Sequence, residues 1–170
     1  YLKQDNTKLV LLMIGGENKR YSPHGIDYLN LSMKVIKSLK HFNAKLLVSI
    51  SRRTPKRAIR ILDKSFSKYL KNYEILTLSK NNPYPDILKT IDYAIVTSDS
   101  VNMISEISTT PIPLFIHKFP KESGKILYFL NDLQNLGIIK VFENELFPFN
   151  KKRLNTNKTT LLKVNKFLGL

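Results

Sequence analysis

Short apolar runs alternate with longer amphipathic stretches along most of the chain. The apolar runs, several of them rich in β-branched residues, cover residues 9–14, 44–50, 74–78, 93–96, 113–117 and 138–142. Continuous runs of this kind are typical of strands that are buried on both faces of a parallel sheet. Apolar residues spaced three and four apart predict helices over residues 27–42, 55–70, 86–90, 101–109 and 121–136. We therefore expect one α/β domain with a Rossmann-like, mostly parallel sheet of about six strands and helices on both faces.

The predicted helix over residues 55–70 separates apolar from basic side chains. We expect Thr54 to be its N-cap and Pro55 to lie in its first turn. The positions expected to face inward are Ala58, Ile61, Leu62, Phe66 and Tyr69. The outer face carries Arg57, Arg60, Lys64, Lys68 and Lys71. This basic face could rest on anionic lipid, or it could be an ordinary solvated surface.

Candidate binding residues follow the first two predicted strands. In open parallel sheets, ligands bind beyond the carboxyl ends of the strands. The first strand runs into Gly15 and Gly16, which would allow the backbone to approach a ligand closely, although the full G-x-G-x-x-G pattern is absent. Arg52 and Arg53 follow the second strand. One of them could clamp a phosphate with two hydrogen bonds, or the two could be surface arginines.

The stretch from residue 93 to residue 106, YAIVTSDSVNMISE, organises the rest of the chain. It predicts a buried strand, a turn of small polar residues and then a helix. A free helix N-terminus at the carboxyl end of a parallel strand suits a phosphate or diphosphate. Glu106, two turns into the helix, could accept hydrogen bonds from a ribose diol. The alternative is an ordinary capped turn followed by a solvated Glu.

The composition excludes several classes of chemistry. The 170 residues contain no Cys, so disulfides, thiolate catalysis and Cys-based zinc sites are excluded. His24, His41 and His117 are not spaced as metal ligands, and we expect no metal. His117, at the end of a predicted strand, could touch a bound sugar or be an ordinary loop histidine. No apolar run approaches the roughly 20 residues that span a bilayer, and a chain that begins with Tyr1 is expected to be part of a longer protein.

The net charge of +15 favours anionic partners: nucleotides, nucleic acid or an anionic membrane surface. A coding bias towards Lys, Asn and Ile would produce the same charge without any binding role. The last segment, residues 151–170, is basic and predicts a terminal helix that begins near Thr156. Sequence-specific nucleic-acid binding is not expected, because the aromatic residues are not interleaved with the basic ones.

Four loop sequences together resemble the mitochondrial fission Elm (elongated mitochondria) family. They are GGENKRY (15–21), SRRTP (51–55), NNPYPDIL (81–88) and VTSDSVNMISE (96–106). Bacterial members of the family look like nucleotide-sugar glycosyltransferases of the GT-B fold. The resemblance implies that the chain is the C-terminal, donor-binding half of such a protein, without the N-terminal acceptor domain. It therefore implies donor binding but little or no turnover by this half alone.

The resemblance also implies roles for individual residues. Glu106 would bind the ribose hydroxyls, while Asn82 and Tyr84, in the loop over 78–84, would lie against the nucleobase. The diphosphate would meet Ser98, Ser100, Val101 and Asn102, along with Gly15, Gly16, Arg52 and Arg53. Asp99 departs from the related glycosyltransferases, which have a small residue or Gly there. A carboxylate would repel a diphosphate unless it caps the helix or contacts a sugar.

The implied partners are a nucleotide-sugar donor, the missing N-terminal domain of the same protein, and an anionic membrane or a lipid-linked acceptor. No cofactor is expected beyond the nucleotide sugar. We expect a cytoplasmic protein, peripheral at the membrane face. The alternative function is a non-catalytic scaffold, because in plants the family resemblance implies recruitment of a dynamin-related protein to the mitochondrial surface.

Overall fold

The computed structural model contains a six-stranded parallel sheet and five helices within the residues it describes. Those residues are 6–17, 22–40, 43–76, 84–120 and 124–154. The elements follow in the order β1 (Lys8–Ile14), α1 (Gly25–Leu39), β2 (Ala44–Ile50), α2 (Lys56–Tyr69), β3 (Tyr73–Leu76), α3 (Tyr84–Thr90), β4 (Tyr93–Thr97), α4 (Val101–Ser108), β5 (Leu114–His117), α5 (Lys125–Asn135) and β6 (Lys140–Val141). The predicted fold class is confirmed, and each predicted strand and each of the five predicted internal helices is present.

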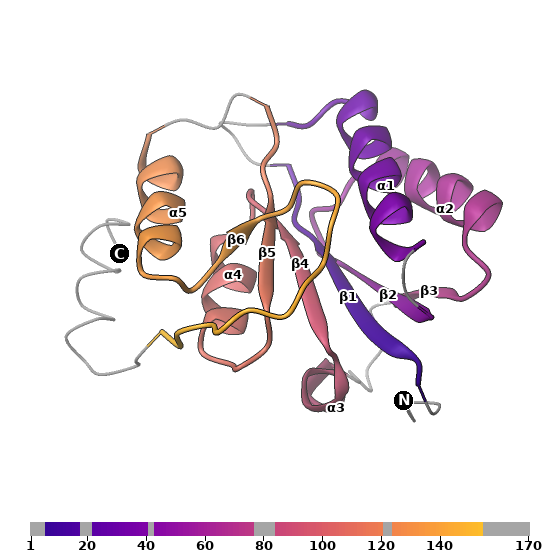
Figure 1. The fold of residues 1–170 in the computed structure, drawn as a ribbon. Coiled ribbons are helices and arrows are strands. Elements are labelled where there is room, and N and C mark those ends of the chain that lie inside the picture. Colours follow the sequence, from indigo (N-terminus) through magenta and orange to yellow (C-terminus); the bar gives the residue numbers. More distant parts are fainter. Residues whose placement is uncertain (1–5, 18–21, 41–42, 77–83, 121–123, 155–170) are drawn as a thin grey trace.

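The strand order of the sheet is β3-β2-β1-β4-β5-β6. The chain builds outwards from β1 to β3 and then crosses to the other side of β1 to build β4, β5 and β6 (Figure 1). All five strand pairs are parallel, and β1 is paired with both β2 and β4. The order in which strands are added to the sheet therefore reverses between β1 and β4. Sheets of this kind have a crevice at their carboxyl edge at that point.

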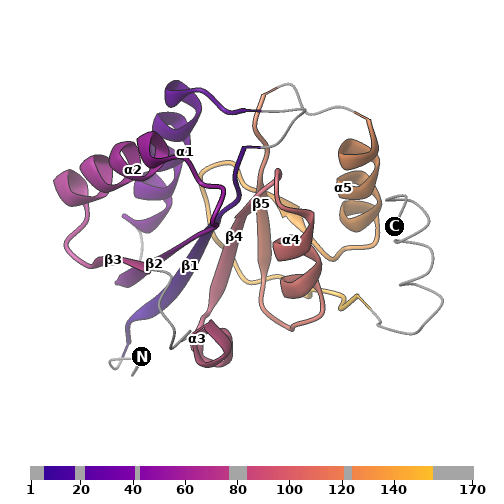
Figure 2. The ribbon, with the colours of Figure 1, turned by 180° about the vertical axis from the view of Figure 1, so that it is seen from behind.

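Helices cover both faces of the sheet, as Figures 1 and 2 show from opposite sides. α1 and α2 lie on one face, and their apolar residues pack on side chains of β1, β2 and β4. α3, α4 and α5 lie on the other face and pack on the side chains of alternate strand positions. Because both faces are covered, every residue of β4 and every residue of β1 after Lys8 is buried.

Residues 142–154 cross the face of β4 and β5 that the helices α1 and α2 leave open (Figure 1). Phe147 and Phe149 pack edge-on against the ring of Phe115, with ring centroids 5.3 Å and 5.6 Å away. The buried Lys151 then donates hydrogen bonds to the carbonyl oxygens of Ile107 (2.7 Å) and Thr110 (2.8 Å). This segment therefore caps the carboxyl end of α4.

Two predictions for α2 are wrong. Its N-cap is Pro55, not Thr54, because the Thr54 hydroxyl donates to the carbonyl oxygen of Gly15 instead (2.6 Å). Tyr69 does not face inward; its side chain is half exposed. The inward position at that end of α2 is taken by Phe66, which packs against Tyr73 with ring centroids 5.9 Å apart. The predicted terminal helix beginning near Thr156 lies outside the described residues.

Candidate functional site

The carboxyl ends of β1 and β4 are joined by side-chain hydrogen bonds. The backbone amide of Gly15 donates to Oγ1 of Thr97 (2.8 Å). The Thr97 hydroxyl in turn donates to Oδ1 of Asp99 (2.6 Å). Thr97 is fully buried, so this chain of hydrogen bonds fixes the two strand ends at the point where the strand order reverses.

Gly15 and Gly16 are required by the close approach of other parts of the chain. A Cβ atom added at Gly15 would overlap the carboxylate of Asp99, and one added at Gly16 would overlap the backbone of Arg53. The loops after β2 and β4 therefore occupy the space that side chains at these two positions would need. The prediction that they serve a closely approaching ligand stays a prediction; the structure shows that they let three loops meet.

The turn over residues 51–54 supports Gly15 from the β2 side. The hydroxyls of Ser51 (3.1 Å) and Thr54 (2.6 Å) both donate to the Gly15 carbonyl oxygen. The amide of Arg53 donates to Ser51 Oγ (3.1 Å), and the amide of Glu17 donates to the Arg53 carbonyl oxygen (3.3 Å). The roles of Ser51 and Thr54 leave no local signal in the sequence, because their partner Gly15 is 36 and 39 residues away.

Arg52 and Arg53 are both exposed, directly beside this junction. Arg53 is near enough to Asp99 for its positive charge to act on that carboxyl group. Arg57, which the sequence places on the outer face of α2, instead pairs with Glu17 (2.5 Å) and donates to the carbonyl oxygen of Pro23 (3.1 Å). Among the described arginines of this edge, Arg52 and Arg53 are therefore the ones without an ion-pair partner that the structure shows, and both can meet an anion from solvent.

Asp99 is turned inwards against Gly15 and is only 9% exposed. Its Oδ1 accepts the Thr97 hydrogen bond, whereas its buried Oδ2 has no hydrogen-bond partner among the described residues. Burial raises the pKa of this carboxyl to about 6, although the Thr97 hydroxyl, the Asp99 amide and the charge of Arg53 all act to lower it. The carboxylate therefore lies behind the turn, and it takes up a proton at a higher pH than an exposed Asp does.

The helix α4 begins directly after this turn. Ser100 is its N-cap, but its side chain makes no capping hydrogen bond. Val101 is half-buried and Asn102 is exposed, so the first turn of α4 is open to solvent. Glu106 is exposed on the second turn of the same helix. The start of α4 therefore offers backbone N–H groups that no described side chain caps.

Ser98 is buried and belongs to the packing between β4 and β5. Its amide donates to the carbonyl oxygen of His117 (3.0 Å), and its hydroxyl oxygen accepts from the amide of Phe119 (3.2 Å). A bound diphosphate would have to share the Ser98 hydroxyl with that amide. Ser100, also buried, lies at the mouth of the α4 N-terminus.

The residues predicted to contact a nucleobase are less well placed. Asn82 lies outside the described residues, and Tyr84 begins α3. α3 lies beside the amino-terminal end of β4 (Figures 1 and 2), whereas the other candidate residues gather at the carboxyl ends of the strands. The assignment of a base-binding role to this loop stays a prediction.

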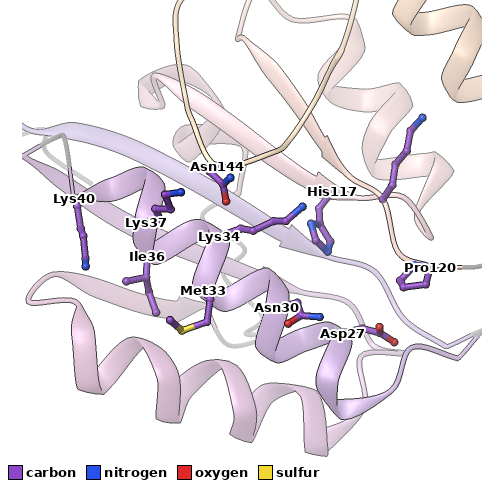
Figure 3. Close-up of a pocket in the computed structure, with 11 residues that line it drawn as sticks. Asp27, Asn30, Met33, Lys34, Ile36, Lys37, Lys40, His117, Pro120 and Asn144 are labelled. Carbon is purple, nitrogen blue, oxygen red and sulfur yellow. The ribbon is translucent and has the colours of Figure 1, made fainter.

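A cavity of about 530 Å³ lies between α1 and residue 144, beside the end of β5. His117 lines it, and Figure 3 shows Lys34 extending from α1 towards the His117 ring, with Asn144 beside them. Burial and the charge of Lys34 lower the pKa of His117 to about 4, so its imidazole is neutral at pH 7. The ring packs edge-on against Phe119, with centroids 5.1 Å apart. The cavity is lined by neither Gly15 nor the start of α4.

Within the part of the chain that the structure describes, no three His, Cys, Asp or Glu side chains gather closely enough to hold a metal ion. None of the described helices has both the length and the apolar character needed to cross a bilayer. The candidate site at the strand ends therefore consists of backbone amides, hydroxyls, two exposed arginines and the buried Asp99.

Two curated proteins are similar to this chain in sequence. The chain is 30% identical over 166 residues to the uncharacterized protein RP120 of Rickettsia prowazekii (strain Madrid E), an alignment that covers 91% of this chain and 47% of that protein. It is 30% identical over 95 residues to the mitochondrial fission protein ELM1 of Arabidopsis thaliana, covering 56% of this chain and 22% of that protein. The chain thus spans about half, or less, of the length of these curated relatives.

A solved structure confirms the fold. The chain resembles the peptidyl-cysteine decarboxylase EpiD with a TM-score of 0.51 and 16% sequence identity, over 92% of this chain and 98% of that one. At that identity the likeness concerns the fold alone. The sequence profile described as mitochondrial fission ELM1 matches residues 1–164. The chain therefore belongs to the mitochondrial fission ELM1 family.

Proposed function

We propose that this chain binds the diphosphate of a nucleotide sugar at the carboxyl ends of β1 and β4, as the donor-binding half of a GT-B-type, glycosyltransferase-like protein. The observation that carries the proposal is the start of α4. Its N-terminus opens at the point where the strand order reverses, and no side-chain hydrogen bond caps it. Helix N-termini in this position attract anions through their free N–H groups and the positive end of the helix dipole.

The surrounding residues suit a diphosphate. Arg52 and Arg53 are exposed at the neighbouring loop, where their guanidinium groups supply positive charge. The backbone amides of Val101 and Asn102 are the donors that a phosphate oxygen would meet first. Glu106, exposed one turn further along α4, is the group proposed for the ribose hydroxyls.

The inward position of Asp99 removes the main objection to diphosphate binding. Its carboxylate lies against Gly15 and is nearly buried, so it does not face the solvent side of the turn. A bound diphosphate would raise the pKa of Asp99 above its value of about 6 and favour uptake of a proton. Protonation of Asp99 would reduce the repulsion that the sequence leads us to expect.

Binding can be tested by thermal unfolding and titration calorimetry with UDP, GDP, ADP, CDP and their sugar conjugates. A ligand at 100 times its dissociation constant should stabilise the chain by about 2.7 kcal/mol. Replacing both Arg52 and Arg53 with Met should weaken binding at least tenfold. Replacing Arg60, an exposed arginine on α2, with Met should leave the affinity for the nucleotide unchanged. Equal binding by both variants would refute the assignment of the arginines.

A non-catalytic scaffold at a membrane surface is the second candidate function. It is favoured by one specific observation, the exposed apolar and basic surface formed by α1 and α2. The Arabidopsis relative is named as a mitochondrial fission protein. Stabilisation by one class of nucleotide would support donor binding. Failure of every nucleotide to stabilise the chain at millimolar concentration would leave two explanations, a scaffold or a donor site that needs the N-terminal half.

A further inference from the structure

Exposed apolar side chains gather in a groove between α1 and α2. Of the seven large apolar residues that are exposed in the described chain, four line this groove. They are Ile26 (58% exposed), Leu29 (40%), Met33 (46%) and Tyr69 (50%). The groove has a volume of about 480 Å³, and α1 and α2 lie side by side on the outer surface (Figures 1 and 2). Apolar clusters of this kind on a protein surface mark interaction sites.

Positive charge lies along the α2 side of the groove. Lys64 and Lys68 line it, and the Lys68 ammonium lies 5.1 Å from the centre of the Tyr69 ring. Further basic residues continue along the exposed side of α2 at Lys56 and Arg60, whereas Arg57 is paired with Glu17.

The two acidic residues on these helices lie outside the groove, and each accepts a hydrogen bond from a neighbouring part of the chain. Asp27 is buried, and its carboxylate accepts a hydrogen bond from the backbone amide of His24 (2.7 Å). Asp63 accepts a hydrogen bond from the hydroxyl of Tyr73 (2.8 Å). Neither of them lines the groove.

We propose that this α1–α2 surface docks on a bilayer that contains anionic phospholipid. A bilayer interface offers an apolar layer for the exposed Ile, Leu, Met and Tyr side chains and negative headgroups for the lysines. The lysine stems can lie along the apolar side chains while the ammonium groups reach the headgroups. The surface thus combines the two signals, apolar and basic, that stable interfacial binding needs.

Charge and extent favour a bilayer over other occupants. A second copy of the chain would bring a groove that is lined by the same two lysines and by no acidic residue, so it would offer no charge complementarity. The basic residues also run from Lys56 to Lys68, which is roughly 18 Å of helix and extends beyond the groove. An anionic bilayer matches positive charge over that whole length, whereas a single docked segment would cover only the groove.

The surface is next to the proposed donor site but does not depend on it. α1 begins at Gly25, shortly after the end of β1, so the groove starts near the carboxyl edge of the sheet. Docking through α1 and α2 would leave the start of α4 on the opposite face of the sheet free. Lipid binding and nucleotide binding are therefore measured separately, and either can fail without the other.

Sedimentation with lipid vesicles tests the proposal on the 170-residue chain. We expect binding to vesicles in which about a third of the lipid is phosphatidylglycerol, weakening with salt, and little binding to phosphatidylcholine alone. The double variant Leu29→Ser/Met33→Ser should bind the anionic vesicles at least tenfold more weakly. Its matched control, Tyr128→Ser/Leu136→Ser, changes two exposed residues of similar size near α5 and should bind like the original chain.

Charge reversals separate docking from general attraction. Lys64→Glu/Lys68→Glu should reduce partitioning at least 25-fold, because each basic residue near an anionic surface contributes roughly fivefold. The control Lys125→Glu/Lys152→Glu changes net charge equally at exposed positions elsewhere. If both double variants lose vesicle binding to the same extent, the attraction is non-specific and the proposal is overturned. Absence of binding to anionic vesicles by the unmodified chain, folded by circular dichroism, would also overturn it.

Discussion

Replacing Asp99 with Asn should change how the stability of the chain depends on pH. Asp99 is nearly buried, and one of its oxygens has no hydrogen-bond partner among the described residues. The Asn side chain has almost the same shape, and its amide oxygen can still accept the hydrogen bond from Thr97. The substitution therefore removes the buried charge and retains the packing against Gly15.

The size of the effect follows from the pKa of Asp99, which burial raises from an ordinary value of 3.8 to about 6. This difference corresponds to about 3 kcal/mol at 1.36 kcal/mol per unit. Because the folded chain holds the proton more tightly, this stability is fully present below about pH 4 and is lost as the pH rises through 6. The gain from Asp99→Asn at pH 8 is at most about 3 kcal/mol, since the buried amide nitrogen also needs a partner.

His117 produces the opposite pH dependence. Burial and Lys34 lower the pKa of His117 from 6.5 to about 4, so the unfolded chain binds more protons between these values. Its contribution to stability therefore increases as the pH rises from about 4 to 6.5. The two dependences largely cancel in the unmodified chain. In Asp99→Asn only the contribution of His117 remains, so the free energy of unfolding of this variant should rise with pH between about 4 and 6.5.

Urea denaturation of both chains between about pH 4 and pH 8 measures this difference directly. The free energy of unfolding of Asp99→Asn minus that of the unmodified chain should be near zero at the acidic end and grow towards pH 8. Asp132→Asn, at an exposed carboxylate of α5, is the control and should show no such growth. A difference that does not change with pH, or a variant that is less stable at pH 8, would refute the reasoning.

Three further substitutions test other parts of the structure. Gly16→Ala places a methyl group against the backbone of Arg53 and should lower the free energy of unfolding by about 1–3 kcal/mol, measured by urea denaturation; an unchanged value would contradict the close approach. Lys151→Met removes the hydrogen bonds to the carbonyl oxygens of Ile107, in α4, and of Thr110, just after it, and should cost about 2 kcal/mol, whereas Lys152→Met at an exposed position should cost almost nothing. Glu106→Ala should abolish nucleotide binding in calorimetry, and unchanged affinity would remove the ribose assignment.

The sequence was sufficient for the fold because burial on both faces leaves a strong local signal. The runs at residues 9–14 and 93–96 are uninterrupted by polar residues, and both became fully buried strands. Strands that alternate with helices can be joined in parallel only through crossovers, so the fold class followed. The order β3-β2-β1-β4-β5-β6 could not be read in the same way, because it depends on contacts between strands distant in sequence.

The candidate site was predicted less completely because its residues act through distant partners. Local spacing correctly placed Ser100 before a helix, but it assigned Thr54 to a cap when its hydroxyl is used by Gly15. The sequence predicted that the Asp99 carboxylate would repel a diphosphate, but it did not show that the neighbouring Gly15 leaves room for the carboxylate to turn inwards. Tyr69 has the periodicity of an inward residue, but Phe66 already occupies that space.

Hydrogen bonds from the buried Lys151 connect the carboxyl end of α4 to residues 151–154. Its ammonium holds the carbonyl oxygens at one end of the helix, while the amide of Leu154 donates to the Ser108 carbonyl oxygen (2.9 Å). An anion bound at the other end would place opposite charges at the two poles of the helix dipole. Ligand binding and the anchoring of residues 151–154 would then reinforce each other, so a chain shortened before Lys151 would lose affinity at a site one whole helix away.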